Sequence, residues 1–442
     1  MTPVAIGTFM IIAVLVLMFA GIPIPFAMAL MGTLGIIMMR SPSAALTLLA
    51  GDLFGEFSTY SLTVAPIFAL MGYFAYFTGL GSNLFKSLDC LIGHHRGGLA
   101  MATQLACTGF GAICGSATAT TATMCAVAYP EMRRFGYSPQ IAGPGLVVGG
   151  TIACLIPPSS TFIIYGMATS TSIGALFMGG IGAGLLMTLC GIVTIRIICR
   201  MHPEYAPQNV TKKSFSEFVD SCKAGGILEV LIIFVVAMGG MFAGFFTPTE
   251  AGAVGSGAFL IVLMIRRKIN WRGFVKSLMA SCRMMAMIYL LLACAKIFSR
   301  MFTMSTIPTL VGNWVAGLAI SPYLVLAVII IIYVILGAIA DLMAMLLLTL
   351  PLFYPIICGT LGYSPVWFGV VCTIMLGIGG LTPPVGNGVY TVATLTKWDE
   401  ESSVGKLFVG AVPYIIGMLI CVVILAIFPQ IVTFLPSLQY SV

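Results

Sequence analysis

Apolar residues fill the chain in long runs, and polar residues are confined to short segments between those runs. The stretch from Leu324 to Ile339 contains no charged residue, and comparable stretches recur along the whole length. Strands of a membrane barrel would place a polar residue at every second position, and these stretches do not. The pattern therefore predicts α-helices that span a membrane.

Composition supports a membrane fold over almost the entire chain. Of the 442 residues, 60% are hydrophobic and 7% are charged, whereas an average soluble domain carries about 25% charged residues. A soluble globule is excluded, and we expect an all-α polytopic membrane protein. The first apolar run lacks a basic leader and a cleavage site, so we interpret it as the first helix and not as a removed signal. The predicted spans are 3–20, 23–39, 60–80, 141–165, 173–199, 226–246, 248–265, 284–303, 323–336 with its helical continuation, 366–392 and 404–428.

Charged residues, cysteines and missing motifs exclude several other classes of protein. The 20 Lys and Arg outnumber the 13 Asp and Glu, but the excess lies in short loops, where it determines membrane orientation and does not indicate nucleic-acid binding. The 13 cysteines lie mostly inside apolar runs without metal-type spacing, and we interpret them as packing residues. No nucleotide-binding, zinc-protease or nucleophile-elbow motif is present. We therefore expect no enzyme and no resident cofactor, and an ion gradient must drive any transport.

Two apolar segments are interrupted near their centres. Residues 99–130 contain a Gly, Ser and Thr cluster at 115–120, and residues 323–357 contain a break at 337–341. A segment of this length with such a centre enters the membrane and returns to the same side. Irregular backbone at membrane depth is tolerated only where protein or a watery cavity covers it. We therefore predict two re-entrant helical hairpins.

Three motifs recur with one constant spacing of 226 residues. The repeated strings are Gly-Ala-Ile at 111–113 and 337–339, Gly-Tyr-Ser-Pro at 136–139 and 362–365, and Leu-x-Pro-Pro at 155–158 and 381–384. A Pro-Pro pair and a four-residue string in one register are improbable by chance. We therefore predict two homologous halves, 1–210 and 227–442, joined by a polar linker at 211–226. Each half contains one hairpin and one broken helix, at about 141–165 and about 366–392.

Loop charge predicts that the two halves are inverted with respect to each other. Basic residues lie in the first-half segments 86–96 and 133–134, while the equivalent segments 312–322 and 357–365 contain none. The asymmetry reverses at 266–276, where the second half carries the basic cluster. Because basic loops are cytoplasmic, the halves have opposite topology, with five crossings plus a hairpin each and both chain ends outside. Inverted repeats with discontinuous helices are typical of secondary transporters.

Several charged positions have less specific interpretations. Residues 44–58 and 270–283 occupy equivalent places and are too polar to span, so we expect interfacial amphipathic helices. Lys296 and Arg300 lie one turn apart, and we expect them to snorkel or to contact a partner subunit. His94 and its neighbour His95 lie beside a basic residue, and we interpret them as loop residues and not as metal ligands.

Four breaks carry the predicted chemistry: the two hairpin tips, and the Pro-Pro interruptions at 155–161 and 381–387. Proline breaks the helical hydrogen-bond ladder and frees backbone carbonyls, and Ser and Thr add hydroxyl oxygens. Such neutral oxygens are ligands for a hard cation such as Na⁺, and half-helix C-termini favour it. The symmetry predicts two sites, one in each half. The alternative is a kink required only for packing.

Asp341 is the one carboxylate well inside an apolar stretch, between Leu336 and Pro351. A charge at membrane depth is costly, which makes this residue a functional candidate. The alternative is that Asp341 caps the hairpin helix that begins at Leu342.

Several strings taken together identify a family resemblance. They are Gly-Ile-Pro-Ile-Pro at 21–25, Gly-His-His-Arg-Gly-Gly-Leu-Ala at 93–100, Cys-Gly-Ser-Ala-Thr-Ala-Thr at 114–120, Pro-Glu-Met at 130–132, Gly-Gly-Thr at 149–151, Ile-Pro-Pro-Ser at 156–159, Phe-Thr-Pro-Thr-Glu-Ala at 246–251 and Thr-Pro-Pro-Val-Gly at 382–386. The chain resembles, over essentially its whole length, the large DctM-like membrane subunit of tripartite ATP-independent periplasmic (TRAP) transporters, in the ion-transporter superfamily.

The resemblance implies a Na⁺-coupled, elevator-type importer of organic acids in the bacterial inner membrane. A periplasmic substrate-binding protein delivers the substrate in such systems, and a small four-helix, DctQ-like membrane subunit supports the large one. Because the five-crossing first half starts at Met1, we expect the small subunit to be a separate chain. The substrate class is C4-dicarboxylate, sialic acid or keto acid. The rival interpretation is a Na⁺- or H⁺-coupled anion carrier that works without a binding protein.

The resemblance also implies roles for individual residues. The first Na⁺ site would use Gly115, Ser116 and Thr120 of the first hairpin with Pro157 and Ser159 of the first broken helix. The residues implied for the second Na⁺ site are Gly337, Asp341, Thr382, Val385 and Gly386. Hydroxyls of Ser116, Ser159 and Ser160, beside hairpin N-termini, are expected to bind the substrate carboxylate.

Overall fold

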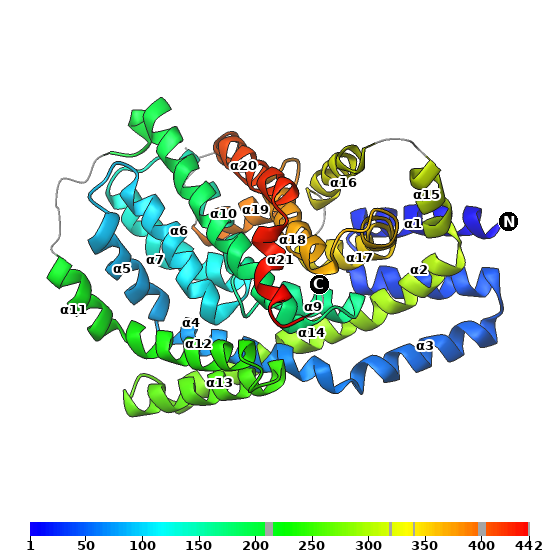
Figure 1. Cartoon of the computed structure of the whole chain (residues 1–442), viewed down its shortest axis with the longest axis horizontal. Coiled ribbons are helices and arrows are strands. Elements are labelled where there is room, and N and C mark those ends of the chain that lie inside the picture. The colour runs from blue at the N-terminus through cyan, green and yellow to red at the C-terminus, as the bar shows by residue number, and fades with distance from the viewer. Residues whose placement is uncertain (208–214, 318–320, 339–340, 397–403, 441–442) are drawn as a thin grey trace.

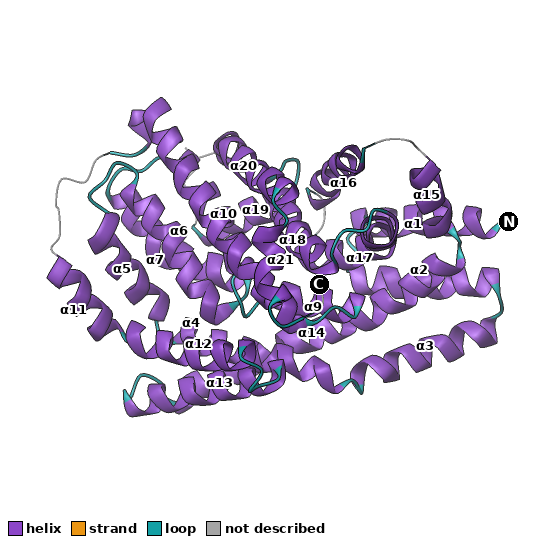
Figure 2. Cartoon of the chain, viewed as in Figure 1, coloured by secondary structure: helices purple, strands orange, loops and turns teal. Residues whose placement is uncertain are grey.

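The computed structural model describes all residues except 208–214, 318–320, 339–340, 397–403 and 441–442. Every regular element in the described part of the chain is a helix, which confirms the all-α prediction (Figure 2). Two predicted features fall partly outside the described residues, namely linker positions 211–214 and the centre of the second hairpin at 339–340.

Figure 1 shows the arrangement of the helices, whose bounds follow. They are α1 (Pro3–Phe19), α2 (Ile24–Met39), α3 (Pro42–Phe57), α4 (Val64–Phe77), α5 (Leu80–Ile92), α6 (Gly98–Cys114), α7 (Ala117–Arg134), α8 (Pro139–Leu155), α9 (Ser160–Thr169), α10 (Ile173–Met201), α11 (Phe215–Gly225), α12 (Ile227–Phe242), α13 (Pro248–Ile265), α14 (Trp271–Met304), α15 (Ile307–Gly317), α16 (Pro322–Gly337), α17 (Leu342–Tyr354), α18 (Pro365–Leu381), α19 (Asn387–Leu395), α20 (Val404–Ile427) and α21 (Gln430–Ser437). Three shorter turns are η1 (Tyr60–Thr63), η2 (Pro203–Tyr205) and the π-helical η3 (Pro355–Thr360).

Local sequence explains where many helices begin. Hydroxyl residues followed by proline precede α1, α3, α13 and α16, and the hydroxyl accepts a hydrogen bond from a free N–H of the first turn. Proline fits the first turn because its missing N–H has no helical partner there. At α13, the Thr247 and Glu250 side chains bind each other's backbone N–H groups in a capping box.

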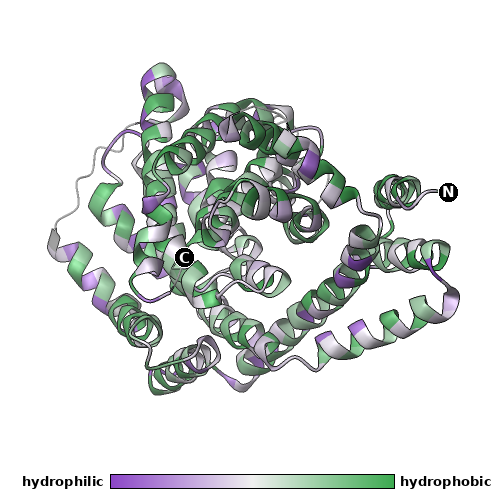
Figure 3. Ribbon diagram, turned by 45° about the vertical axis from the view of Figure 1, so that its right-hand side comes forward, coloured by the Kyte–Doolittle hydropathy of each residue, from purple (hydrophilic) through white to green (hydrophobic). Residues whose placement is uncertain are grey.

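The helices are long and apolar enough for a multi-pass membrane protein. Within the described residues, six helices meet the length and hydropathy of a span, or up to eight if each bent pair is one span. Hydrophobic residues cover most helices, and hydrophilic residues gather mainly at helix ends and in connecting loops (Figure 3). On α10, Leu185, Leu189, Val193 and Ile197 form an exposed stripe at helical spacing, which is the surface expected to face lipid.

Helix α14 packs antiparallel against α3 and α4. We call these three helices the spine. Ser281 of α14 donates its hydroxyl hydrogen to the Pro66 carbonyl at 2.8 Å, and the rings of Phe74 and Phe274 stack with centroids 6.1 Å apart. Because α14 is continuous over 34 residues, the expectation of a separate interfacial helix at 270–283 is wrong. Its counterpart 44–58 does form a separate helix, α3.

The opposite end of the spine is held by ion pairs. Arg300 Nε lies 2.6 Å from Asp52 Oδ2, and Lys296 Nζ lies 2.5 Å from Glu56 Oε1. Both pairs join α14 to α3, one helical turn apart. The expectation that Lys296 and Arg300 snorkel or contact another subunit stays a prediction, because both are paired within the chain but their side chains are 42% and 45% exposed.

A second group of helices, which we call the bundle, packs around α8 and α18 and comprises α6, α7, α9, α10, α16, α17, α19, α20 and α21. Trp367 of α18 is buried and donates its indole N–H to the Leu425 carbonyl of α20 at 2.8 Å. Tyr414 of α20 donates to the Ile141 carbonyl of α8 at 3.0 Å. These bonds satisfy the polar ends of two large buried aromatic side chains in an otherwise apolar core.

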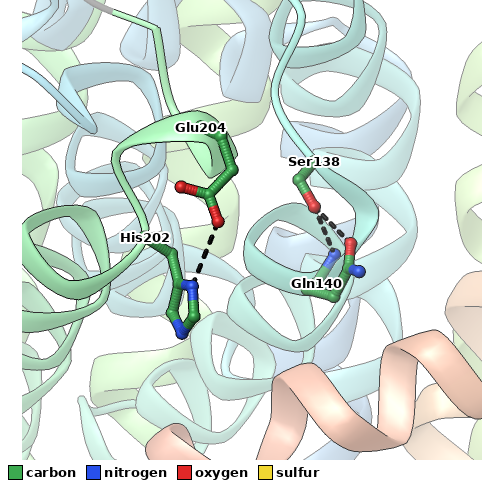
Figure 4. Close-up of polar contacts among 4 residues, drawn as sticks. All are labelled: Ser138, Gln140, His202 and Glu204. Carbon is green, nitrogen blue, oxygen red and sulfur yellow. Dashed lines mark hydrogen bonds and ion pairs between the residues drawn. The ribbon is translucent and has the colours of Figure 1, made fainter.

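At the end of α10, the chain turns back toward the start of α8 (Figure 4). The Tyr205 carbonyl accepts a hydrogen bond from the Ser138 N–H at 2.8 Å, and the Ser138 hydroxyl binds Gln140. The His202 ring lies 3.1 Å from a carboxylate oxygen of Glu204. The pKa of Glu204 lies below its ordinary value because its own backbone N–H and His202 stabilise the carboxylate. The segment that follows α10 is thus anchored to the start of α8.

Candidate ion and substrate site

The first hairpin turns at Gly115, between α6 and α7. Gly115 has φ +58°, a left-handed conformation, and a side chain there would overlap the Pro158 carbonyl. Both facts require glycine. Ser116 then begins α7 as its N-cap, and its hydroxyl accepts from the Ala119 N–H at 3.5 Å.

The first broken helix lies beside this turn. α8 ends at Leu155, the Pro157–Pro158 bond is cis, and α9 continues at an angle of 51°. The buried Ser159 hydroxyl donates to the Cys154 carbonyl at 2.5 Å and accepts from the Phe162 N–H at 3.2 Å. Ser159 thus replaces part of the ladder that the prolines remove.

Ser160 joins the hairpin to the broken helix. Its backbone N–H and its hydroxyl both donate to the Gly115 carbonyl, at 3.0 Å and 2.9 Å. The predicted first-site residues Gly115, Ser116, Pro157 and Ser159 therefore do come together around one contact. In this arrangement the Ser160 hydroxyl binds protein.

Two threonines beside this contact have unused hydroxyls. Thr120 and Thr161 are each 0% exposed, and their Oγ1 atoms have no hydrogen-bond partner among the described residues. A buried hydroxyl without a partner is costly unless something else binds it. Neutral hydroxyl oxygens suit Na⁺, so these two positions fit a cation site. Thr120 was predicted and Thr161 was missed, although it directly follows the Ser159-Ser160 pair.

The second hairpin is closed by Asp341. Its Oδ2 accepts from the Met343 N–H at 3.3 Å, so Asp341 is the N-cap of α17, as the alternative interpretation expected. Its Oδ1 accepts from Nδ2 of Asn387, the first residue of α19, at 3.4 Å. Unlike the first break, this pair is exposed. Capping and a ligand role are compatible, because an ionised carboxylate has several acceptor sites.

The second broken helix repeats the connection seen in the first. α18 ends at Leu381, the Pro383–Pro384 bond is cis, and the Gly386 N–H donates to the Ala338 carbonyl of the hairpin at 3.1 Å. Gly386 has φ +52°. The Thr382 hydroxyl donates to the Ile378 carbonyl at 2.8 Å, and Val385 is 40% exposed.

The same close helix crossing occurs in both halves. A Cβ on Gly111 would lie 2.6 Å from Cα of Ala153, and one on Gly337 would lie 2.9 Å from Cα of Gly379. Each pair joins the end of the first hairpin helix to the helix that precedes the prolines. Small residues at both positions therefore allow each hairpin to approach its broken helix closely.

A cavity of about 90 Å³ lies where the two halves meet. Its lining residues are Ala117, Thr118, Thr121, Val147, Thr151, Asp341, Leu342, Leu376, Gly377, Gly380, Asn387, Gly388 and Thr391. Of the predicted residues, Asp341 lines it, whereas Ser116, Ser159 and Ser160 do not. The threonines and Asn387 were missed, although Thr118 and Thr121 share one helix face by their spacing. Which helices face one another is a tertiary property that spacing alone does not give.

The cavity is suited to an anion. The N-terminal residues of α7, α17 and α19 border it, and helix N-termini carry partial positive charge and free N–H groups. Hydroxyls of Thr118 and Thr151 and the Asn387 amide supply further hydrogen bonds. Asp341 is the one charged residue among the described residues that line it, and its carboxylate repels an anion unless a bound cation offsets that charge.

The fold and site define a class of protein first. The structure of the YdaH transporter of Alcanivorax borkumensis shares the fold, with a TM-score of 0.59 and 14% identity over 88% of this chain and 89% of that one. The two chains therefore share a polytopic all-helical fold. The sequence matches the family described as "Tripartite ATP-independent periplasmic transporter, DctM component" over residues 11–431. The chain belongs to this family.

Curated relatives agree with this assignment. The C4-dicarboxylate TRAP transporter large permease protein DctM of Pseudomonas aeruginosa is 34% identical over 91% of this chain and 92% of the relative. The sialic acid TRAP transporter large permease protein SiaM of Vibrio cholerae is 29% identical over 96% of both. The isethionate TRAP transporter permease protein DctMQ of Oleidesulfovibrio alaskensis is 28% identical over 98% of this chain and 66% of the relative. The chain is a TRAP transporter large permease, with no enzyme role.

Proposed function

We propose that this permease imports an organic acid by secondary active transport coupled to Na⁺. The observation that carries the proposal is the meeting of two interrupted helices and two hairpins around a cavity bordered by helix N-termini. Freed carbonyls and hydroxyls provide for a cation, and the N-termini provide for an anion. Symport of a carboxylate with Na⁺ requires both kinds of group within one body.

The first Na⁺ site uses the contact between the first hairpin and the first broken helix. The buried Thr120 hydroxyl is available as a ligand, with Gly115, Ser116, Pro157 and Ser159 shaping the backbone around it. Thr161 adds a second available hydroxyl.

The second Na⁺ site combines Asp341 with the backbone around Gly337 and the segment Thr382, Val385 and Gly386. An exposed carboxylate beside freed backbone carbonyls is a site for a hard cation. The Gly386 connection to Ala338 places this segment against the second hairpin.

The substrate is an organic acid held in the cavity between the halves. Relatives are named for C4-dicarboxylate, for sialic acid and for isethionate, all of which are acids. The Thr118, Thr121 and Thr151 hydroxyls on one side and Asn387 on the other are placed to bind it. Ser116, Ser159 and Ser160 support the backbone of that site at short range.

The two halves, 1–210 and 227–442, act as inverted repeats in an elevator mechanism. Support comes from the paired features 226 residues apart, since Thr151 packs against its equivalent Gly377 at the cavity. The ion-paired spine of α3, α4 and α14 is the scaffold, and the bundle around α8 and α18 carries the substrate. The linker at 211–226 lies on the cytoplasmic side, where the basic loops belong.

Two further components complete the transporter in the bacterial inner membrane. The relative named DctMQ carries both designations in one protein, and this supports a DctQ-like small membrane subunit as a partner here. A periplasmic binding protein delivers the organic acid to the outer face.

Uptake into proteoliposomes tests the proposal. The permease, co-purified with its small subunit, is assayed with a carboxylate panel, with and without the binding protein and an inward Na⁺ gradient. Accumulation that requires both supports the proposal. Accumulation of free substrate without the binding protein overturns the tripartite mechanism and supports a carrier of the same fold that works alone.

A further inference from the structure

A second and larger cavity, of about 420 Å³, separates the spine from the bundle. One wall is α14, and the other walls are the end of α9 and the segment formed by α17 and η3. The cavity shares no lining residue with the smaller one described above. The proposed ion and substrate sites do not use this cavity.

Its polarity is graded along the helices. On α14 the lining runs from Leu292 near the middle of the helix to Lys296, Ser299 and Thr303 near its end at Met304. On the first broken helix the lining likewise changes from Met167 to the polar residues that end α9. The lining is therefore apolar toward the middle of these helices and polar toward their ends.

The opposite wall has the same order. Leu347 and Leu350 of α17 line the inner part, and Tyr354 at the end of α17 lies beyond them. An aromatic ring with a hydroxyl is typical of the membrane interface, where one end is apolar and the other is wet. All three walls thus change from apolar to polar in the same direction.

A half-buried pair of opposite charges lies at the polar part. Glu56 and Lys296 line the cavity with side chains 14% and 42% exposed, and they lie 2.5 Å apart. The two charges are paired with each other, but an ammonium has further donors and a carboxylate has a second oxygen, so the site favours a ligand that itself carries both charges. A purely anionic ligand gains from Lys296 but is repelled by Glu56.

We propose that this cavity binds one phospholipid with a zwitterionic phosphoethanolamine headgroup. The phosphate lies at Lys296, Ser299 and Thr303, the ammonium lies at Glu56, and an acyl chain follows Leu292, Leu347 and Leu350. This matches the direction of the polarity gradient and the sign of each charge. If the bundle moves against the spine as proposed above, the lipid occupies the sliding surface, but its binding does not depend on that motion.

Native mass spectrometry of the full chain with its small subunit tests the proposal. The probes are palmitoyl-oleoyl phosphatidylethanolamine and the phosphatidylglycerol of the same chains, added to delipidated protein. We expect one tightly held phosphatidylethanolamine, preferred over phosphatidylglycerol by at least about fivefold, which corresponds to about 1 kcal/mol. Equal retention of the two lipids, or retention of neither, overturns the proposal.

The adjacent ion pair provides a matched control. The double variant Glu56→Gln with Lys296→Gln removes the charges that line the cavity, and Asp52→Asn with Arg300→Gln removes a pair that joins the same helices without lining it. We expect the first variant to lose the preference and the second to keep it. If both variants, or the control alone, lose the preference for phosphatidylethanolamine, the effect comes from the packing of the spine and the proposed lipid site is overturned. Because lipid retention is measured without transport, this result is separable from failure of the transport proposal.

Discussion

The two breaks use the same backbone connection but differ in charge and exposure. At the first, Ser160 binds the Gly115 carbonyl inside the protein, and the available ligands are the fully buried hydroxyls of Thr120 and Thr161. At the second, Gly386 binds the Ala338 carbonyl, and the available ligand is the exposed carboxylate of Asp341. The proposed first Na⁺ site is therefore neutral and enclosed, and the proposed second one is acidic and more open.

This difference has a consequence for ion exchange. A cation at the proposed first site would be surrounded by protein, whereas one at the proposed second site would lie beside an exposed carboxylate. We expect the second site to exchange Na⁺ faster in this conformation. A charged ligand at the open site also offsets the stronger competition from water there.

The largest expected effect comes from the glycine that closes the first break. Gly115→Ala would place Cβ against the Pro158 carbonyl at φ +58°, and backbone is unable to yield there. We expect a loss of stability of about 4 kcal/mol or more, the range of exceptional substitutions, measured as thermal unfolding in detergent. Gly386→Ala meets the Phe408 ring at 2.6 Å, and a side chain can rotate away, so we expect a smaller loss.

Gly21→Ala separates backbone strain from the clash. Gly21 has φ +85°, and nothing lies within 4 Å of a Cβ placed there. This variant should lose only about 1–2 kcal/mol, the cost of a left-handed conformation. A loss at Gly115 no greater than that at Gly21 would contradict the enclosed first break.

The next effect concerns the charge at the second break. Asp341→Asn keeps an N-cap of equal quality for α17, so the fold should be retained. Losing a charged ligand costs about 1.5–3 kcal/mol, which weakens Na⁺ binding by about 10- to 100-fold. The measurement is the Na⁺ concentration at which the Na⁺-dependent rise in the melting temperature of the purified protein reaches half of its maximum. Asp220→Asn on α11 is the matched control, and an equal response in both variants would remove Asp341 from the site.

Removal of the buried hydroxyls at the first break should weaken Na⁺ binding by an intermediate amount without lowering the stability of the Na⁺-free protein. Thr120→Val and Thr161→Val remove hydroxyls that have no hydrogen-bond partner, so stability without Na⁺ should stay equal or rise. Na⁺ binding should weaken by about tenfold, which corresponds to about 1.4 kcal/mol. Thr103→Val is the control, because its hydroxyl is buried and bonded to the Leu99 carbonyl at 2.8 Å. Reduced stability with unchanged Na⁺ binding would indicate packing roles only.

The sequence predicts these local features well for a physical reason. Pro-Pro pairs break a helix wherever they occur, and Asp before an apolar run caps a helix, so the breaks and the cap of α17 depend on neighbouring residues. The ion pair between Glu56 and Lys296 joins residues 240 positions apart, and no local pattern reveals it. The same limit applies to the cavity threonines.

The helices of the spine show that segments at equivalent sequence positions can form different structures. Equivalent positions form one continuous helix in α14, but α3 ends at Phe57 and is followed by η1. There the Thr59 hydroxyl bonds to the Gly55 carbonyl at 2.7 Å and the Thr63 hydroxyl to the Tyr60 carbonyl at 2.7 Å. Hydroxyl residues that bond to nearby carbonyls favour helix ends and turns. The repeat symmetry predicted similar helices in both halves. The hydroxyl side chains near the end of α3 favour a helix end there instead.

The smallest effect should appear in the cavity that the two breaks share. Thr118→Val removes one hydroxyl that faces the cavity, and a neutral hydrogen bond contributes about 0.5–1.5 kcal/mol. We expect the KM for the organic acid to rise by about 2- to 10-fold in the reconstituted transporter, with the maximal rate unchanged. Thr123→Val on the same helix is the control, because its hydroxyl bonds to the Ala119 carbonyl at 2.8 Å and does not line the cavity. An equal shift in KM for both variants would mean that α7 acts through its packing, and the substrate would then have to be held by the helix N-termini and Asn387 alone.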